Sequence, residues 1–197
     1  MSKKFLLLYD IMKKILAALI VLLMPIFVVA QNLSAYGVSL GDSKYVVEDE
    51  LESKGKKIKY TTNKYGEEIY RVSNPSIGGA NFDGVSFVFN DENKLRMISF
   101  YASCPRGTGT PGMPWEAEFK RQAAKCKNAF LTMSQNLVLK YGEPVAYSDS
   151  TAMWQIGDQR ITLDYKYVYQ YEQYGSIDHE VSVSLQYSII DLNSADY

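Results

Sequence analysis

His179 is the only histidine in the chain, so a serine triad or any other histidine-dependent catalysis would have to use it. It lies between Asp178 and Glu180 at the start of a predicted strand. A solvated or hydrogen-bonded surface imidazole is the common case at such a position. We therefore expect no catalytic residues, and a hydrolase that uses His179 is only a remote alternative.

Other groups capable of chemistry are also few. The glycine-rich stretch 104–115, "CPRGTGTPGMPW", lacks the Lys-Ser/Thr ending of a phosphate-binding loop, so we expect a flexible connector there. The carboxylate pairs Asp49/Glu50 and Glu67/Glu68 are adjacent in sequence, which indicates solvated positions rather than an acid/base dyad. One histidine and two isolated cysteines do not make a metal-ligand set, so we expect neither a metal nor a cofactor.

Cys104 and Cys126 are the only cysteines of the chain. Cys126 belongs to a series of residues spaced three and four apart, typical of the buried face of a long helix: Trp115, Phe119, Ala123, Cys126, Phe130, Met133 and Leu137. Cys104 is expected to end a strand just before the loop that leads into this helix. A disulfide between them would contribute about 3 kcal/mol by closing that loop. Two unpaired buried thiols are the alternative.

Residues 12–30, "MKKILAALIVLLMPIFVVA", have the organisation of a secretory signal peptide. Two lysines precede a short apolar run interrupted only by Pro25, and the small residues Val28 and Ala30 occupy the positions before a cleavage site. A spanning helix needs about 20 apolar residues, and this run is shorter. We therefore expect residues 1–30 to be a signal peptide that is removed on export.

Residues 1–11 add a second basic start that a signal does not need, so Met12 is an alternative start of the protein. Cleavage after Ala30 leaves 167 residues, enough for one exported domain at 31–197. The chain has 21 basic and 22 acidic residues, of which the removed part holds four lysines and one aspartate, so the remaining net charge is near −4. An acidic surface without basic clusters argues against nucleic acid or an anionic membrane as partner. We expect a periplasmic or secreted location and no membrane span after cleavage.

The first half of the domain, about residues 37–104, is predicted to be one short helix followed by four antiparallel strands. Asp42 or Ser43 is suited to begin the helix, and Gly55 is suited to end it. The segments "KIKYTT" and "EEIYRV", and then "VSFVFN" and "KLRMISFY", flank turn-forming residues, as the strands of β-hairpins do.

The second half, about residues 113–190, repeats this order of elements. Pro114 suits the first turn of a long helix that runs to Tyr141, and Gly142 ends it. Strands are expected at about 151–156, 159–171 and 179–190. The predicted fold class is therefore α+β, with two helix-plus-antiparallel-strand units that form one sheet with helices packed on one face.

Strand 159–171 alternates apolar or aromatic residues with polar ones, so one face of the sheet should be packed and the other solvated. Its 13 residues span more than about 40 Å at 3.3 Å per residue, and we expect the strand to extend beyond the helices that cover it. Tyr169, Tyr171 and Tyr174 would then form an exposed contact patch at the tip of a hairpin.

Two short segments are similar to parts of a known group of small exported bacterial domains. They are "YGVSLGDSKYVVEDELESKG" at 36–55, with a glycine-apolar-serine entry and a short helix, and "KYGEP" at 140–144, a helix exit. The group includes the β-lactamase inhibitory protein and the SmpA/OmlA lipoprotein of outer-membrane barrel assembly. The resemblance is confined to these segments and implies the same kind of fold.

Together these features predict a non-catalytic module that binds a protein of the envelope or the extracellular space through its sheet face or its hairpin tips. The alternative is a small-ligand or glycan-binding protein that stacks its ligand on aromatic residues such as Trp154, Tyr169 and Tyr171. A ligand-binding protein should have a concave aromatic pocket, whereas a protein-binding module should present a broad, shallow surface.

Overall fold

The computed structural model describes residues 33–171 and 175–190, apart from the side chains of Pro105 and Arg106. The described residues belong to one compact unit, Asn32–Tyr197. The predicted signal peptide, residues 1–30 with the alternative start at Met12, lies outside them. Within the described part, no helix has the length and apolar composition needed to cross a membrane.

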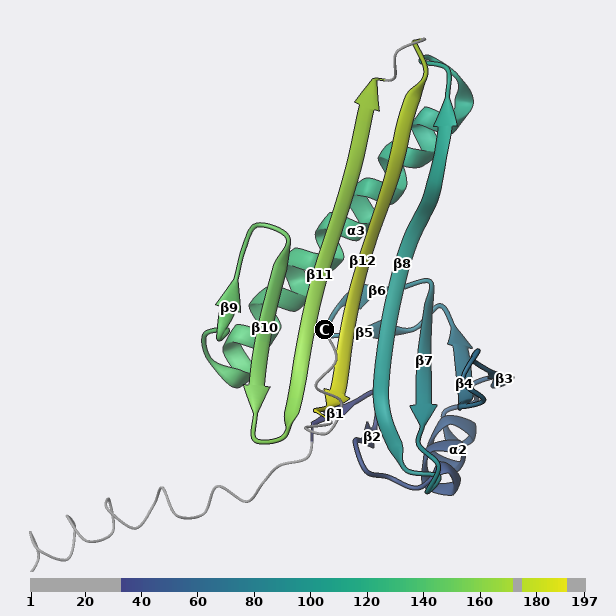
Figure 1. Ribbon diagram of the computed structural model, residues 1–197, viewed down its shortest axis with the longest axis vertical. Coiled ribbons are helices and arrows are strands. Elements are labelled where there is room, and N and C mark those ends of the chain that lie inside the picture. Colours follow the sequence, from purple (N-terminus) through teal and green to yellow (C-terminus); the bar gives the residue numbers. More distant parts are fainter. Residues whose placement is uncertain (1–32, 172–174, 191–197) are drawn as a thin grey trace, which may run out of the picture. The chain divides into compact units, whose positions relative to one another are not determined.

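An eight-stranded antiparallel sheet is the main feature of this unit (Figure 1). Its strands lie in the order β3-β4-β7-β8-β12-β11-β10-β9. In chain order they are β3 (Lys59–Thr62), β4 (Glu68–Ser73), β7 (Gly84–Phe89), β8 (Leu95–Gly109), β9 (Ala146–Tyr147), β10 (Thr151–Ile156), β11 (Gln159–Tyr171) and β12 (Ile177–Ile189). Two small two-stranded sheets accompany it, made of β1 (Ser34–Ala35) with β2 (Val38–Ser39) and β5 (Ser76–Ile77) with β6 (Ala80–Asn81).

The described part of the chain contains two helices, α2 (Lys44–Ser53) and α3 (Pro114–Tyr141). Ser43 caps the start of α2, because its hydroxyl accepts a hydrogen bond from the Val46 N–H at 3.4 Å. At the end of α3, Gly142 has a φ of +81°, a conformation that favours glycine. The predicted ends of the long helix, Pro114 and Tyr141, are confirmed.

The strand order is symmetric about the middle of the sheet. Each half of the chain supplies a helix and then four strands of the sheet, and the last strand of each half, β8 or β12, lies at the centre. These two strands pair with each other from Met97 and Ser188 to Gly109 and Ile177. The predicted α+β fold of two helix-plus-strand units that share one sheet is confirmed.

Both helices pack on the same face of the sheet. α3 contacts β8, β11 and β12, and in Figure 1 it runs behind these strands. Cross-strand neighbours form buried rows on this face, for example Tyr70, Phe87, Ile98, Tyr187, Ile161 and Trp154. Val47 and Leu51 of α2 belong to the same core. Side chains of the opposite parity point away from both helices, and we call the surface that they form the open face.

β8 is longer than the sequence predicts. The glycine-rich stretch 104–115 is expected to be a flexible connector, but its first part continues β8 as far as Gly109. There Gly107 lies opposite His179, and Gly109 lies opposite Ile177 of β12. The prediction was wrong because glycine has a low intrinsic strand preference, and the extended conformation here accompanies pairing with a strand much later in the chain.

α3 is about as long as the longest strands of the sheet. Its 28 residues span about 42 Å at 1.5 Å per residue, and the 13 residues of β11 span about 43 Å at 3.3 Å per residue. The prediction that this strand extends beyond its helical cover is wrong at Tyr169, which packs on Phe119, and holds at Tyr171, which is 72% exposed.

Candidate functional site

The open face consists of rows of side chains that lie opposite one another across the strands. The middle row contains Arg71, Ser86, Ser99, Gln186 and Thr162. The row on one side of it contains Ser73, Gly84, Tyr101, Ser184 and Asp164. The row on the other side contains Ile69, Val88, Met97, Ser188 and Arg160.

The centre of the open face carries no charge. On β7, β8 and β12 these rows hold only glycine, serine, glutamine, tyrosine, valine and methionine, and Ser103 and Ser182 continue them. The charged residues of the rows lie on the flanking strands: Arg71 on β4, and Arg160 and Asp164 on β11. The signal in the sequence is the alternation of uncharged polar residues in "SVSLQYS" and "MISFYAS", although only the fold shows that these segments are neighbours.

Tyr101 is the largest side chain at this centre and is 40% exposed. It lies opposite Gly84, and a Cβ atom added to Gly84 would be 2.4 Å from the tyrosine hydroxyl oxygen. The Tyr101 ring therefore lies over the glycine, in space that any larger residue would occupy. A tyrosine held in this way presents an aromatic surface and a hydroxyl to whatever contacts the open face.

The opposite face of the sheet has a different character at the end of the β11–β12 hairpin, where the first turns of α3 cover it. The Tyr169 ring stacks on Phe119 with ring centroids 5.7 Å apart, and Phe119 is 1% exposed. Tyr169 is half-buried, so the predicted exposed patch is wrong for this residue. Tyr171 is 72% exposed, and Tyr174 lies outside the described residues.

His179 is buried in the same cluster. Its ring stacks on Trp115 with centroids 4.2 Å apart and meets Phe119 edge-on at 5.1 Å. Its Nδ1 atom is buried without a hydrogen-bond partner among the described residues. A Cβ atom at Gly107 would lie 3.2 Å from the imidazole Nε2, so glycine makes room for the ring on β8. The expectation of a solvated surface histidine is wrong, because aromatic side chains of α3 cover it.

Residues 37–41, "GVSLG", have the G-x-S-x-G spacing of a hydrolase nucleophile turn, which sequence reasoning overlooked. Ser39 lies in β2, and its N–H donates to Asp42 Oδ2 at 2.7 Å. The N–H of Gly41 donates to the Leu95 carbonyl, at the opposite end of β8 from the histidine. Gly107, which faces His179, is 12 positions further along β8, about 40 Å at 3.3 Å per residue. Ser39 and the histidine therefore do not form a triad in this structure.

Glu116 ties the first turn of α3 to β11. Its carboxylate accepts hydrogen bonds from the Tyr169 hydroxyl at 3.1 Å and the Gly112 N–H at 3.0 Å, and it forms an ion pair of 2.7 Å with Lys120. The hydrogen bond from Lys120, followed by those from Gly112 and Tyr169, lowers the pKa of the Glu116 carboxyl from its ordinary 4.5 to about 2. The cluster at this end of the sheet is thus held by polar as well as aromatic contacts.

Both cysteines are free thiols, so the prediction of a disulfide between Cys104 and Cys126 is wrong. The Cys126 thiol is directed to the Ala102 carbonyl, to which it donates at 3.4 Å. Ala102 lies one same-face position before Cys104 on β8, and β8 does not end at Cys104 as predicted. Burial raises the pKa of the Cys126 thiol to about 11 and also raises the pKa of Cys104. Both are therefore protonated at neutral pH and weakly reactive.

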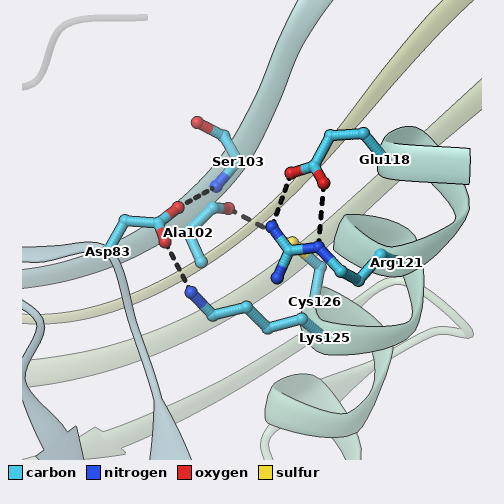
Figure 2. Close-up of polar contacts among 7 residues, drawn as sticks. All are labelled: Asp83, Ala102, Ser103, Glu118, Arg121, Lys125 and Cys126. Atoms are coloured by element: carbon cyan, nitrogen blue, oxygen red, sulfur yellow. Dashed lines mark hydrogen bonds and ion pairs between the residues drawn. The ribbon is translucent and has the colours of Figure 1, made fainter. Parts of the chain in front are cut away.

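A polar cluster surrounds Cys126 (Figure 2). Its members lie on β8, on α3 and at Asp83, the residue that precedes β7. Asp83 accepts a hydrogen bond from the Ser103 N–H at 2.9 Å and one from Lys125 at 2.5 Å. On the same side of α3, Arg121 donates both to Glu118 Oε2 at 2.8 Å and to Oε1 at 2.5 Å. Asp83 thereby joins β8 to α3. It precedes Gly84, the first residue of β7, so it lies where the pairing of β8 with β7 stops. We interpret this cluster as structural.

A hollow of about 370 Å³ lies against the β3–β4 edge, lined by Lys44, Tyr60, Thr61, Thr62, Glu68, Ile69 and Tyr70. Its charged and phenolic side chains already bond to other protein side chains. The hydroxyls of Tyr60 and Tyr70 donate to the two oxygens of Glu48 at 2.7 and 3.4 Å, and Lys44 pairs with Glu68. The hollow therefore offers few free polar groups to a ligand.

The aromatic residues predicted for a glycan site do not come together. Trp154 is 2% exposed, and its indole N–H donates to the Gly142 carbonyl at 2.8 Å. It lies opposite Ile161, whereas Tyr169 and Tyr171 are eight and ten positions further along β11. At 3.3 Å per residue, Tyr169 and Tyr171 are therefore about 26 Å or more from the position of Trp154, too far to stack on the same ligand.

The acidic pairs are also dispersed. Glu50 forms an ion pair of 2.7 Å with Lys54, and Glu67 one of 2.7 Å with Arg96. Asp49 is exposed on α2. In the part of the chain that the structure describes, no group of three or more histidine, cysteine and acidic side chains is arranged to hold a metal ion.

Comparison with known proteins gave no relative: no family model, no curated protein and no solved structure matches the chain.

Proposed function

We propose that this chain is an exported, non-catalytic module that binds another protein, and that the partner contacts the open face of the sheet. The observation that carries the proposal is the uncharged centre of this face on β7, β8 and β12, with charged residues on the strands to either side. A surface that meets only water normally mixes lysine, arginine and acidic residues throughout. Protein interfaces instead exclude charge from their centre and place polar residues at their rim.

The kinds of residue at this centre also favour binding. Ser86, Ser99, Ser184 and Ser188 have short side chains, which lose less conformational entropy on burial than lysine or glutamate do. Tyr101 adds one large aromatic ring whose position over Gly84 is already defined. Serine together with tyrosine is the composition that antibody paratopes use for protein recognition.

The proposed compartment is the periplasm or the extracellular space. Its support is the signal-like segment at residues 12–30 together with the small residues Val28 and Ala30 before Gln31. A partner should accordingly be an envelope or extracellular protein.

A photo-crosslinking amino acid tests the proposal directly. With p-benzoylphenylalanine in place of Tyr101, irradiation of cells that make the protein should give a discrete cross-linked species that contains one second protein. The matched control carries the same amino acid in place of Tyr65, which is 75% exposed in the turn between β3 and β4. The control should give little or none of this species. Equal yields at both positions, or no protein product at Tyr101, would contradict the proposal.

A further inference from the structure

Charges at the border of the open face bear on the kind of partner it accepts. Lys59 of β3 lies opposite Arg71 of β4, and both are exposed. Neither side chain makes a hydrogen bond or an ion pair with another residue of the described ranges. Two neighbouring positive charges at one border of the open face thus lack a partner within the described structure.

Arg160 occupies the other side, on β11, between Ser188 and Gln155. Its side chain is half-buried by its neighbours, and its Nε atom is buried without a hydrogen-bond partner among the residues that the structure describes. A buried, unpaired guanidinium nitrogen is energetically unfavourable unless an acceptor reaches the group. No hydrogen bond or ion pair joins the terminal nitrogens of Arg160 to another described residue, so this end of the side chain is suited to bind a carboxylate.

The carboxylates of the open face, in contrast, already have partners. Asp164 accepts a hydrogen bond of 2.9 Å from the Thr151 hydroxyl, and Glu180 forms an ion pair of 2.8 Å with Lys166. Within the described ranges, the charges of this face that remain without a partner are thus basic, although the chain as a whole is slightly acidic.

The spacing of these basic residues fits a single interface. Arg71 and Arg160 are separated by the three central strands, that is, by four steps between neighbouring strands, or about 19 Å at 4.8 Å per step. A standard interface buries about 800 Å² on each partner, which corresponds to a patch about 30 Å across. Both arginines therefore fall within one such patch, on opposite sides of its uncharged centre.

We propose, on the basis of the proposed function, that the partner is a protein with an acidic docking surface. Its carboxylates meet Arg71 with Lys59 on one side and Arg160 on the other, while neutral residues meet the serines and Tyr101 between them. Complementary charge at the rim accelerates association and selects against basic partners. Nucleic acid is disfavoured because the basic side chains are few and stand apart, whereas phosphate backbones are bound by concentrated lysine and arginine.

The test uses the full chain with p-benzoylphenylalanine at Tyr101. We expect Arg71→Glu combined with Arg160→Glu to reduce the yield of cross-linked partner by about tenfold or more, because like charges would then face each other. The matched control is Lys127→Glu with Lys140→Glu, which reverses two charges on α3, in the layer on the other face of the sheet. It should leave the yield within about twofold.

A second measurement keeps the positive charges and so does not depend on how the reversed variant folds. In the variant Arg71→Lys with Arg160→Lys, a carbodiimide that joins amines to carboxylates should link residues 59, 71 and 160 to aspartate or glutamate of the partner. Mass spectrometry of the linked peptides identifies both ends.

The outcomes separate the two proposals. A lower yield after charge reversal together with amide links to partner carboxylates supports the acidic partner. An unchanged or higher yield, or a partner without carboxylates within reach of these positions, overturns the acidic partner but leaves protein binding at the open face intact. No protein cross-link at Tyr101, or a cross-link to nucleic acid, overturns both.

Discussion

At the scale of single residues, glycines decide where large side chains lie on this sheet. Gly84 makes room for Tyr101 on the open face, and Gly107 and Gly109 make room for His179 and Trp115 on the other. This role of glycine is hard to predict from a sequence, because a glycine in a strand is usually interpreted as a weak point or a bulge. The identity of the ring that occupies the space depends on which strand or helix lies alongside.

Gly109 offers a direct test of this packing. A Cβ atom there would lie 2.3 Å from the indole ring of Trp115, so Gly109→Ala must displace the ring. We expect the free energy of unfolding to fall by about 1–3 kcal/mol in urea titrations. Thr108→Ala, at the exposed neighbouring position of β8, should change it by less than about 0.5 kcal/mol. Equal effects of the two substitutions would show that Trp115 is not held against Gly109.

Glu116 makes a prediction about pH. A carboxyl group whose pKa in the folded state is below that in the unfolded state stabilises the fold above the unfolded value. For Glu116 this contribution is lost as the pH falls from 4.5 towards about 2. Glu116→Gln should therefore be less stable than the unsubstituted protein at pH 6 and should lose less stability on acidification through this range. Melting temperatures across pH 2–7 measure the difference, and parallel curves for the two proteins would contradict the assignment.

At the scale of elements, the agreement with prediction follows from how local the signals are. The ends of α3 and the bounds of β10 and β11 were predictable, because Pro114, Gly142 and the two-residue alternation of apolar side chains lie within the elements themselves. The extension of β8 through Gly109 was not, because it accompanies pairing with β12. The burial of Tyr169 could be predicted only by comparing the lengths of α3 and β11, since a 28-residue helix is as long as a 13-residue strand.

The cover that α3 provides for the hairpin end can be tested at Phe119. Removal of this ring by Phe119→Ala should cost about 3–5 kcal/mol, because the side chain is buried among Trp115, His179 and Tyr169. Hydrogen exchange should become faster in the last five residues of β11 more than in its first five.

The control for this experiment is Leu139→Ala in the same helix, where the side chain is 85% exposed. It should change stability by less than about 0.5 kcal/mol. A uniform rise in exchange along β11 would indicate that Phe119 supports the whole sheet rather than the hairpin end.

At the scale of the whole described unit, one sheet separates two surfaces of different character. The face under α2 and α3 holds one continuous core, and the open face carries uncharged residues at its centre with basic residues at its borders. The alternation along each strand predicted that a solvated face exists, but its pattern of charge could not be read in advance. That pattern arises because β8 and β12, which come from different halves of the chain, are neighbours in the sheet.

The central claim is that the uncharged centre of the open face is where the partner binds. Its most direct test is the affinity for the protein that cross-links at Tyr101, measured by titration calorimetry with purified proteins. Ser99→Gln combined with Ser184→Gln enlarges two neutral side chains at this centre, and Ala117→Gln combined with Ala124→Gln does the same on the exposed side of α3. We predict that the first pair weakens binding by about a hundredfold, from overpacking at a buried contact, with little change in melting temperature. The second pair should leave the affinity unchanged, and equal affinities for both variants would contradict the claim.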